Sequence, residues 1–429
     1  MISLPLQMCW AMPASRLLSR MALFTAAMFW TLHSHAAVVS PEYFGLHIHR
    51  TDSGTSWPNV QFGSWRMWDS GVQWPDLQTT RGSWNFSRLD RQVRLAKSNH
   101  VAVLLPLGLS PRWASARPDE PSAYGEGKAA EPASMEDWRV YVRKVAQRYK
   151  GRIGAYEIWN EPNSKDFFSG TTTKLVELTC VAYQILKAVD PFIVVVGPAY
   201  TGGQNIAKLE GFLAAGGNKC IDVVAYHLYV PSSPPEAIPS LVKKIQLAMQ
   251  RQGVSHLPLW NTEAGWFIEN ADGTATGKVP DYWLRVSAEQ SAAFVARSLL
   301  LGSASGVERF FWYAWDNITL GLIEPKTKAL KPGGVALGVV ARWMTGGTRP
   351  ACVEAEKLWT CTLASNPDER RVVAWSIGGA QRYTPPSGWS FKQCERADGR
   401  VEALDSSSSM RVDGLPRLFL MSPIKQGAS

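Results

Sequence analysis

Short apolar runs alternate with helix-length segments along most of this 429-residue chain. Runs rich in Val, Ile and aromatic residues, separated by helical stretches, are typical of βα units with a parallel sheet. The eight runs are Phe44–His49, Ser64–Trp68, Val101–Leu107, Gly154–Trp159, Phe192–Pro198, Ile221–Leu228, Leu257–Thr262 and Arg309–Trp315. Eight such units in about 300 residues match the count and size of a closed (β/α)8 barrel. We therefore expect an α/β fold of the TIM-barrel type.

Apolar residues at helical spacing fill the segments between these runs. They predict helices over Glu136–Tyr149, Thr173–Val189, Leu241–Gln250 and Ala288–Gly302. After about Gly346 the pattern changes to short strand-like runs separated by Gly, Pro, Asn and Ser, which indicates a small all-β domain. The expected organisation is a barrel over residues 38–345 followed by a sandwich-like β-domain over residues 346–429.

The first 37 residues have the features of a bacterial secretory signal peptide. Arg16 and Arg20 precede the apolar run Met21–Leu32, which is too short to span a bilayer comfortably, and small residues follow it. An uncleaved membrane anchor is the alternative. Cleavage predicts a secreted or periplasmic protein with no stable membrane insertion.

Export permits disulfides, and five cysteines follow the predicted signal. Cys352 and Cys361 flank what resembles a short hairpin, so we expect them to pair. The odd number leaves at least one thiol unpaired or joined to another chain. The cysteine and histidine spacings contain no CxxC pair and no His-rich pattern, so the sequence indicates no metal and no cofactor.

The net charge of +9 comes from scattered basic residues without a Lys/Arg-rich run, which argues against nucleic acid as a partner. Such a mild excess favours solubility, and an acidic polysaccharide substrate is the alternative. The 19 tryptophans have two interpretations. They are either a core rich in large aromatic residues or flat platforms on which sugar rings stack.

Two glutamates end two of the predicted strands. Glu161 follows the fourth run in Trp159-Asn160-Glu161-Pro162, where proline stops the strand, and Glu263 follows the seventh run. Barrel enzymes place catalytic side chains at the carboxyl ends of their strands. Strands four and seven face each other across the barrel mouth, and cleavage of a glycosidic bond needs one protonated and one ionised carboxyl group. The two positions together predict a glycosidase site.

On these residues the chain resembles the clan A glycoside hydrolases, and most closely family 39 and its relatives associated with bacterial exopolysaccharides. The resemblance covers residues from about 43 to 345. It implies a retaining double displacement in which Glu161 is the acid/base and Glu263 the nucleophile. Asn160, from the same Asn-Glu pair, would bind the sugar 2-hydroxyl.

The resemblance extends to other strand ends. Arg66 on strand two would support the nucleophile electrostatically, although a structural ion pair is equally compatible with its position. In Tyr226-His227-Leu228-Tyr229, His227 would contact substrate and Tyr229 would hydrogen-bond the nucleophile. Trp315, or else Trp312, would form the aromatic floor of the sugar site. At the end of strand one, His47 and His49 are the candidates for contact with the sugar.

The sequence thus predicts a hydrolase of O-glycosidic bonds in a β-linked poly- or oligosaccharide. A transglycosidase would use the same carboxylates, and a non-catalytic polysaccharide-binding protein could use the same scaffold. The β-domain is expected to pack against the barrel, with a carbohydrate-binding module as the alternative. No motif diagnostic for xylose, iduronate or mannose is present, and oligomeric state is left open.

Overall fold

Parallel strands close into a barrel at the eight predicted positions. The computed structural model describes residues 38–404 and 408–424, so the predicted signal segment lies outside the described residues. The strands are β1 (Phe44–Leu46), β2 (Ser64–Arg66), β3 (Ala102–Leu107), β4 (Ala155–Ile158), β5 (Val194–Val196), β7 (Val224–His227), β8 (Leu259–Ala264) and β11 (Val307–Trp312). A short strand β6 (Tyr200–Thr201) pairs with β7, and a parallel bridge between Val196 and Val223 closes the ring between β5 and β7. The (β/α)8 prediction is confirmed.

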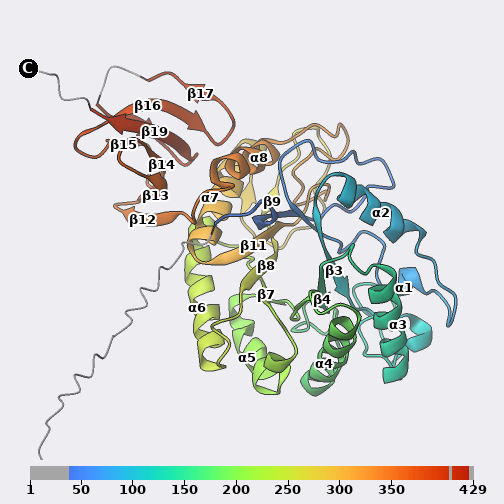
Figure 1. Cartoon of the computed structure of the whole chain (residues 1–429). Coiled ribbons are helices and arrows are strands. Elements are labelled where there is room, and N and C mark those ends of the chain that lie inside the picture. The colour runs from blue at the N-terminus through green and yellow to red at the C-terminus, as the bar shows by residue number, and fades with distance from the viewer. Residues whose placement is uncertain (1–37, 405–407, 425–429) are drawn as a thin grey trace, which may run out of the picture. The chain divides into compact units, whose positions relative to one another are not determined.

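Helices connect most of these strands and lie outside the sheet (Figure 1). They are α1 (Trp74–Leu77), α2 (Ser87–Ser98), α3 (Met135–Arg148), α4 (Thr172–Val189), α5 (Ile206–Ala214), α6 (Ile238–Arg251), α7 (Ala288–Ala304) and α8 (Pro332–Met344). Local sequence sets several starts: the side chains of Ser134, Thr171 and Ser287 cap α3, α4 and α7. Between β1 and β2 the described residues 47–63 contain no helix, so the first unit lacks its α element.

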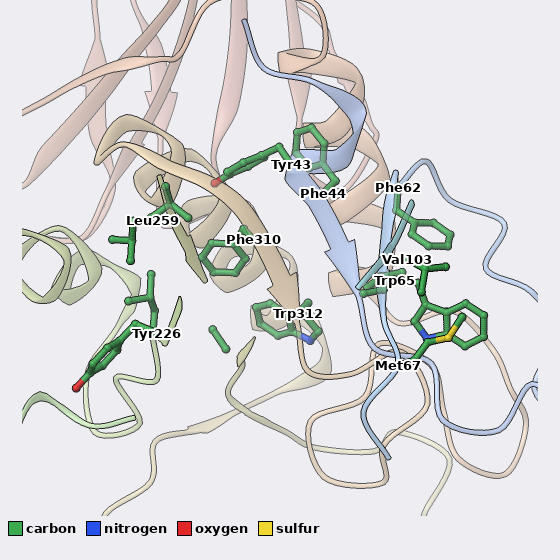
Figure 2. Packing of buried hydrophobic residues seen from close by; sticks show 14 of the residues in the cluster. Tyr43, Phe44, Phe62, Trp65, Met67, Val103, Tyr226, Leu259, Phe310 and Trp312 are labelled. Carbon is green, nitrogen blue, oxygen red and sulfur yellow. The ribbon is translucent and has the colours of Figure 1, made fainter. Parts of the chain in front are cut away.

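Two apolar layers hold the barrel together. The interior layer comes from strand residues with inward side chains: Leu104, Ala155, Val196, Val223, Ala225, Trp260 and Phe311. The larger layer lies between strands and helices, where Tyr43 packs edge-on against Phe44 at 4.9 Å and near Phe310 at 6.4 Å (Figure 2). In the interior layer, Gly45 of β1 is required, because a Cβ there would lie 2.4 Å from the ring of Phe311.

A register shift in β8 changes the side of the sheet that Glu263 faces. Strict alternation from the inward-facing Trp260 would turn Glu263 away from the barrel interior. The pairing of β7 with β8 is irregular here, since Tyr226 pairs with Asn261 but His227 pairs with Glu263. Such a bulge shifts the facing of subsequent residues, so Glu263 reaches the same interior as Trp260.

After α8 the chain forms a separate antiparallel sheet in the order β12-β13-β14-β19-β16-β17. Its strands are β12 (Ala351–Ala355), β13 (Leu358–Ser365), β14 (Arg370–Ser376), β16 (Trp389–Arg396), β17 (Val401–Glu402) and β19 (Arg417–Pro423), beside the pair β15 (Gln381–Tyr383) and β18 (Met410–Val412). The all-β character of this region is confirmed. The sequence did not predict β15, β16 or β17.

Two disulfides are present among the described residues. Cys352 pairs with Cys361 across the β12–β13 hairpin, as predicted, and Cys180 on α4 pairs with Cys220. Cys394 is the remaining described cysteine and has a buried thiol. None of the helices within the described ranges is both long enough and apolar enough to cross a bilayer.

Candidate active site

Glu161 and Glu263 converge at the carboxyl ends of the strands, with His227 between them. The Nδ1 atom of His227 lies 2.7 Å from Oε1 of Glu161 and 3.1 Å from Oε2 of Glu263. One carboxylate oxygen of each glutamate and this nitrogen all lie within 4.8 Å of one another. The side chain of Glu161 is 16% exposed and that of Glu263 is 9% exposed, so Glu161 is the more open to the cavity.

Arg66 is fully buried beneath this pair and connects several strands. Its guanidinium contacts Oε2 of Glu157 on β4 at 2.6 Å and donates to Oδ1 of Asn160 at 2.7 Å. It also lies 3.5 Å from Oε2 of Glu263. Arg66 is therefore a structural ion-pair partner of Glu157 and also a cation beside Glu263. Its position is compatible with both roles considered for it from the sequence.

Electrostatics separate the two glutamates. Burial raises the pKa of Glu161 and of Glu263 to about 7. Because the carboxyls are close, they titrate as a pair and share one proton near neutral pH. Arg66 and Tyr229, whose hydroxyl donates to Oε1 of Glu263 at 3.2 Å, both stabilise a negative charge on Glu263. These two contacts favour the ionised form of Glu263.

His227 contributes to this arrangement as a neutral ring. Burial lowers its pKa to about 4. A neutral imidazole with its proton on Nδ1 donates to the carboxylate oxygens that it faces. The ring has no exposed surface, so it contacts the two glutamates rather than the open cavity. The expected contact of His227 with substrate does not follow from this position.

Left-handed backbone conformations gather around the site. Non-glycine residues with positive φ follow β2, β3 and β4: Asp69 (φ 57°), Leu109 (φ 59°), Trp159 (φ 67°) and Glu161 (φ 42°). Each such residue costs on the order of 1–3 kcal/mol and persists where the surrounding structure fixes it. At Glu161 the amide donates to the carbonyl of Ala199, which holds this turn in place.

A cavity of about 920 Å³ opens above the two carboxyls. This size suits a small ligand such as a short saccharide. Aromatic side chains line much of its wall: Trp68, Tyr124, Phe167, Tyr229, Tyr282, Trp283 and Tyr313. Asn160 also lines it, while Arg66 supports it from below.

Two predicted sugar contacts lie away from the cavity. Trp315 is 3% exposed and does not line it, and Trp312 is buried against Trp266. The reason is that β11 ends at Trp312, so strand alternation does not extend to Trp315. Tyr313, directly after the strand, occupies the wall instead.

His47 is likewise buried, with its Nε2 2.9 Å from the carbonyl of Thr262 on β8. The imidazole therefore reaches from the end of β1 to β8, although β11 lies between these two strands in the sheet. Its neighbour His49 packs against the ring of Tyr313 at 5.1 Å. Neither histidine lines the cavity, which corrects the expected sugar contact of His47.

Sequence reasoning missed three polar residues of the wall. Asp69 comes shortly after β2 and accepts hydrogen bonds from the hydroxyls of Tyr124 and Tyr313, both at 2.7 Å. Asp69 carries the same signal that identified the two glutamates, a carboxylate at the end of a strand. Tyr124 lies in the long loop from Ser110 to Pro132, where no periodic pattern marks it.

Among the described residues, Glu161, His227 and Glu263 are the group whose oxygen and nitrogen atoms are close enough to hold a metal ion. Their separations of 2.7 and 3.1 Å are hydrogen-bond distances. Hydrogen bonding therefore accounts for the cluster.

Comparison with known proteins connects this site to one family. Residues 58–270 match the model of glycosyl hydrolases family 39. A β-xylosidase of Geobacillus stearothermophilus is 27% identical over 283 residues, which are 59% of this chain and 52% of the relative. The chain thus spans about half the length of that relative.

Solved structures agree on the fold. A family 39 glycoside hydrolase from Bacteroides cellulosilyticus superposes with a TM-score of 0.67 at 17% identity, covering 90% of this chain and 82% of that one. A monomeric β-xylosidase from Caulobacter crescentus gives a TM-score of 0.63 at 16% identity, covering 91% and 98%. Because these superpositions cover 90% and 91% of this chain, they include more of it than the barrel alone. Residues 58–270, about half of the chain, are thus similar to glycosyl hydrolases family 39, and the fold of the chain is similar to that of a solved family 39 glycoside hydrolase.

Proposed function

We propose that this protein hydrolyses β-linked oligosaccharides with retention of anomeric configuration, with Glu161 as acid/base and Glu263 as nucleophile. The observation that carries the proposal is the approach of the two carboxyls to within 4.8 Å, oxygen to oxygen. Retaining glycosidases place their carboxyl groups about 5–5.5 Å apart, whereas inverting enzymes leave about 6.5–9.5 Å for a water molecule. The short separation supports direct attack by one carboxylate.

The electrostatic asymmetry supports the assignment of roles. Glu263, beside Arg66 and Tyr229, is the carboxylate that attacks the anomeric carbon and forms a glycosyl ester. Glu161 donates its proton to the departing glycosidic oxygen. In the second step Glu161 takes a proton from water, and the water oxygen displaces Glu263 from the sugar.

Asn160 is placed to bind the substrate. Its Oδ1 accepts from Arg66, so its orientation is fixed with the amide NH₂ toward the cavity that it lines. In this proposal the NH₂ group donates to the sugar 2-hydroxyl. Hydrogen bonds to that hydroxyl strengthen in the transition state of retaining glycosidases.

The names of the relatives support β-xylosides and xylo-oligosaccharides as the first substrates to test, because two of the proteins compared above are β-xylosidases. We further propose that the chain acts outside the cytoplasm. The support is the signal-like sequence at the N-terminus and the two disulfides, which persist in oxidising compartments.

Turnover tests the proposal. The purified protein and its Glu263→Gln variant are incubated with β-xylosides, xylo-oligosaccharides, other polysaccharides and aryl glycosides, and new reducing ends are measured. Cleavage by the wild type and not by the variant supports the proposal. Saccharide binding by both proteins without any cleavage would indicate a polysaccharide-binding protein instead. Products longer than the substrate would indicate a transglycosidase.

A further inference from the structure

Asp69 is a third carboxylate on the cavity wall, and the mechanism above does not use it. It is half-buried, with a left-handed backbone (φ 57°) that fixes its side chain beside the site. The hydroxyl of Tyr124 donates to Oδ1, and the hydroxyl of Tyr313 donates to Oδ2, both at 2.7 Å. Each oxygen of Asp69 therefore accepts one hydrogen bond from a tyrosine hydroxyl. Each oxygen retains lone pairs for a further donor.

The charges facing the cavity are mostly negative. Among the described residues that line it, the acidic side chains are Asp69, Glu161 and Glu263. Glu161 and Glu263 both lie against Nδ1 of His227, so ionisation of one disfavours ionisation of the other, and the negative charge of this pair adds to the carboxylate of Asp69. The cation on the same wall is Lys244, an exposed residue of α6.

The buried cation beneath the cavity does not reverse this balance. The charge of Arg66 is matched by Glu157 at 2.6 Å, and both side chains are fully buried. His227 is neutral because burial lowers its pKa to about 4. The cavity is therefore electronegative although the whole chain carries a net charge of +9. The net charge of the chain thus gives no support to an acidic saccharide at this site.

We propose that Asp69 determines specificity by accepting hydrogen bonds from hydroxyl groups of the bound sugar and by repelling sugars that carry a carboxylate. The substrate class is then uncharged β-linked saccharides. Hydroxyl donors to a carboxylate form charge-assisted bonds, about twice as strong as neutral ones. A uronate would instead place a like charge beside Asp69 and Glu263, and such a juxtaposition weakens binding strongly. This inference rests on the proposed function, because it names the substrate class of the same site.

A matched pair of ligands tests the inference by binding rather than by turnover. Cellotriose and the β-1,4-linked trisaccharide of glucuronic acid share their linkage and differ at C6. Each is titrated against the wild type, and tryptophan fluorescence reports binding because Trp68 and Trp283 line the cavity. We expect the neutral trisaccharide to bind at least about tenfold more tightly.

Two variants separate the charge of Asp69 from its structural role. Asp69→Asn keeps the shape and removes the charge, so it should weaken cellotriose binding and shrink the preference for the neutral ligand about tenfold. Tyr124→Phe removes one hydrogen bond but keeps the carboxylate, so the preference should remain. Asp166→Asn, an exposed carboxylate in the loop after β4, is the matched control and should leave both affinities unchanged.

Three results would contradict the proposed role of Asp69. Equal affinity of the wild type for both ligands, no binding of cellotriose, or an unchanged preference in Asp69→Asn would overturn the inference. The comparison of the two ligands on the wild type does not depend on the folding of any variant. A protein that shows the preference and yet cleaves no saccharide would refute the proposed hydrolase activity while leaving the role of Asp69 intact.

Discussion

Replacing Glu161 with Gln removes the proton that the proposed mechanism delivers to the leaving group. The amide keeps the size of the side chain, and its oxygen can still accept a hydrogen bond from His227, which lies 2.7 Å from Oε1 in the wild type. The change therefore acts on acid catalysis with little effect on shape. General acid catalysis typically contributes about 10²–10⁴-fold to the rate.

The size of the loss should depend on the leaving group. For a glycoside with a poor leaving group, such as an oligosaccharide, kcat/KM should fall by about 10²–10⁴-fold in Glu161→Gln. For a nitrophenyl glycoside the loss should be much smaller, because nitrophenolate departs without a proton. The parameter kcat/KM is the right one, because it reports the first, glycosylation step.

The same variant should change the pH profile of kcat/KM. Burial raises the pKa of Glu161 to about 7, and this group must be protonated, so the wild type should lose activity as the pH rises through about 7. This alkaline limb should disappear in Glu161→Gln. Glu263 must be ionised, and in the proposed mechanism it ionises while Glu161 is still protonated and uncharged. The acid limb should therefore stay near its wild-type position in Glu161→Gln.

The assay measures initial rates on both substrates between about pH 4 and 9, with Asp166→Asn as the control that retains the wild-type profile. An alkaline limb that persists near pH 7 in Glu161→Gln would refute the assignment of the proton to Glu161. Equal losses on good and poor leaving groups would refute its role as the acid.

Three further changes test the surroundings of the site. Tyr229→Phe removes the hydroxyl that stabilises the nucleophile, and a lost bond to a charged group is worth about 1.5–3 kcal/mol, so kcat/KM should fall roughly 10- to 150-fold in steady-state assays. Glu157→Leu removes the nearest ionic partner of the buried Arg66, so urea unfolding should show a loss of about 3–5 kcal/mol; an unchanged midpoint would mean that the pair is not buried as described. Replacing both Cys180 and Cys220 with Ser opens a loop with a sequence separation of 40, which should cost about 4 kcal/mol in the same measurement, and full stability of this variant would contradict the pairing.

Hydrophobic pattern was sufficient for the barrel because most residues of its strands are buried. All residues of β4 and β8 are buried, and their apolar residues are interrupted by only a few polar ones, with the catalytic candidates at or near the strand ends. The pattern failed at β16, where buried, half-buried and exposed residues are mixed and no apolar run results. It also could not predict the two-residue strand β17, which exists only through its pairing with β16.

The site residues also differ in whether a local sequence pattern could predict them. Glu161 and Glu263 could be predicted because each follows an apolar strand within a recognisable short motif. The choice of Trp315 came from the family resemblance, and its position three residues beyond the end of β11 at Trp312, outside the cavity wall, gives that choice no support. The pairing of Asp69 with Tyr124 joins residues 55 positions apart, and it depends on the course of a loop that no local pattern determines.

The covalent intermediate tests the central claim most directly. The protein is incubated with the 2-deoxy-2-fluoro derivative of the aryl β-glycoside that it cleaves best, and the labelled peptide is located by mass spectrometry. Retention through Glu263 predicts a glycosyl adduct on the peptide that contains Glu263, and no adduct in Glu263→Gln. An adduct on another residue, or turnover of the natural substrate with an inverted first product, would contradict the mechanism.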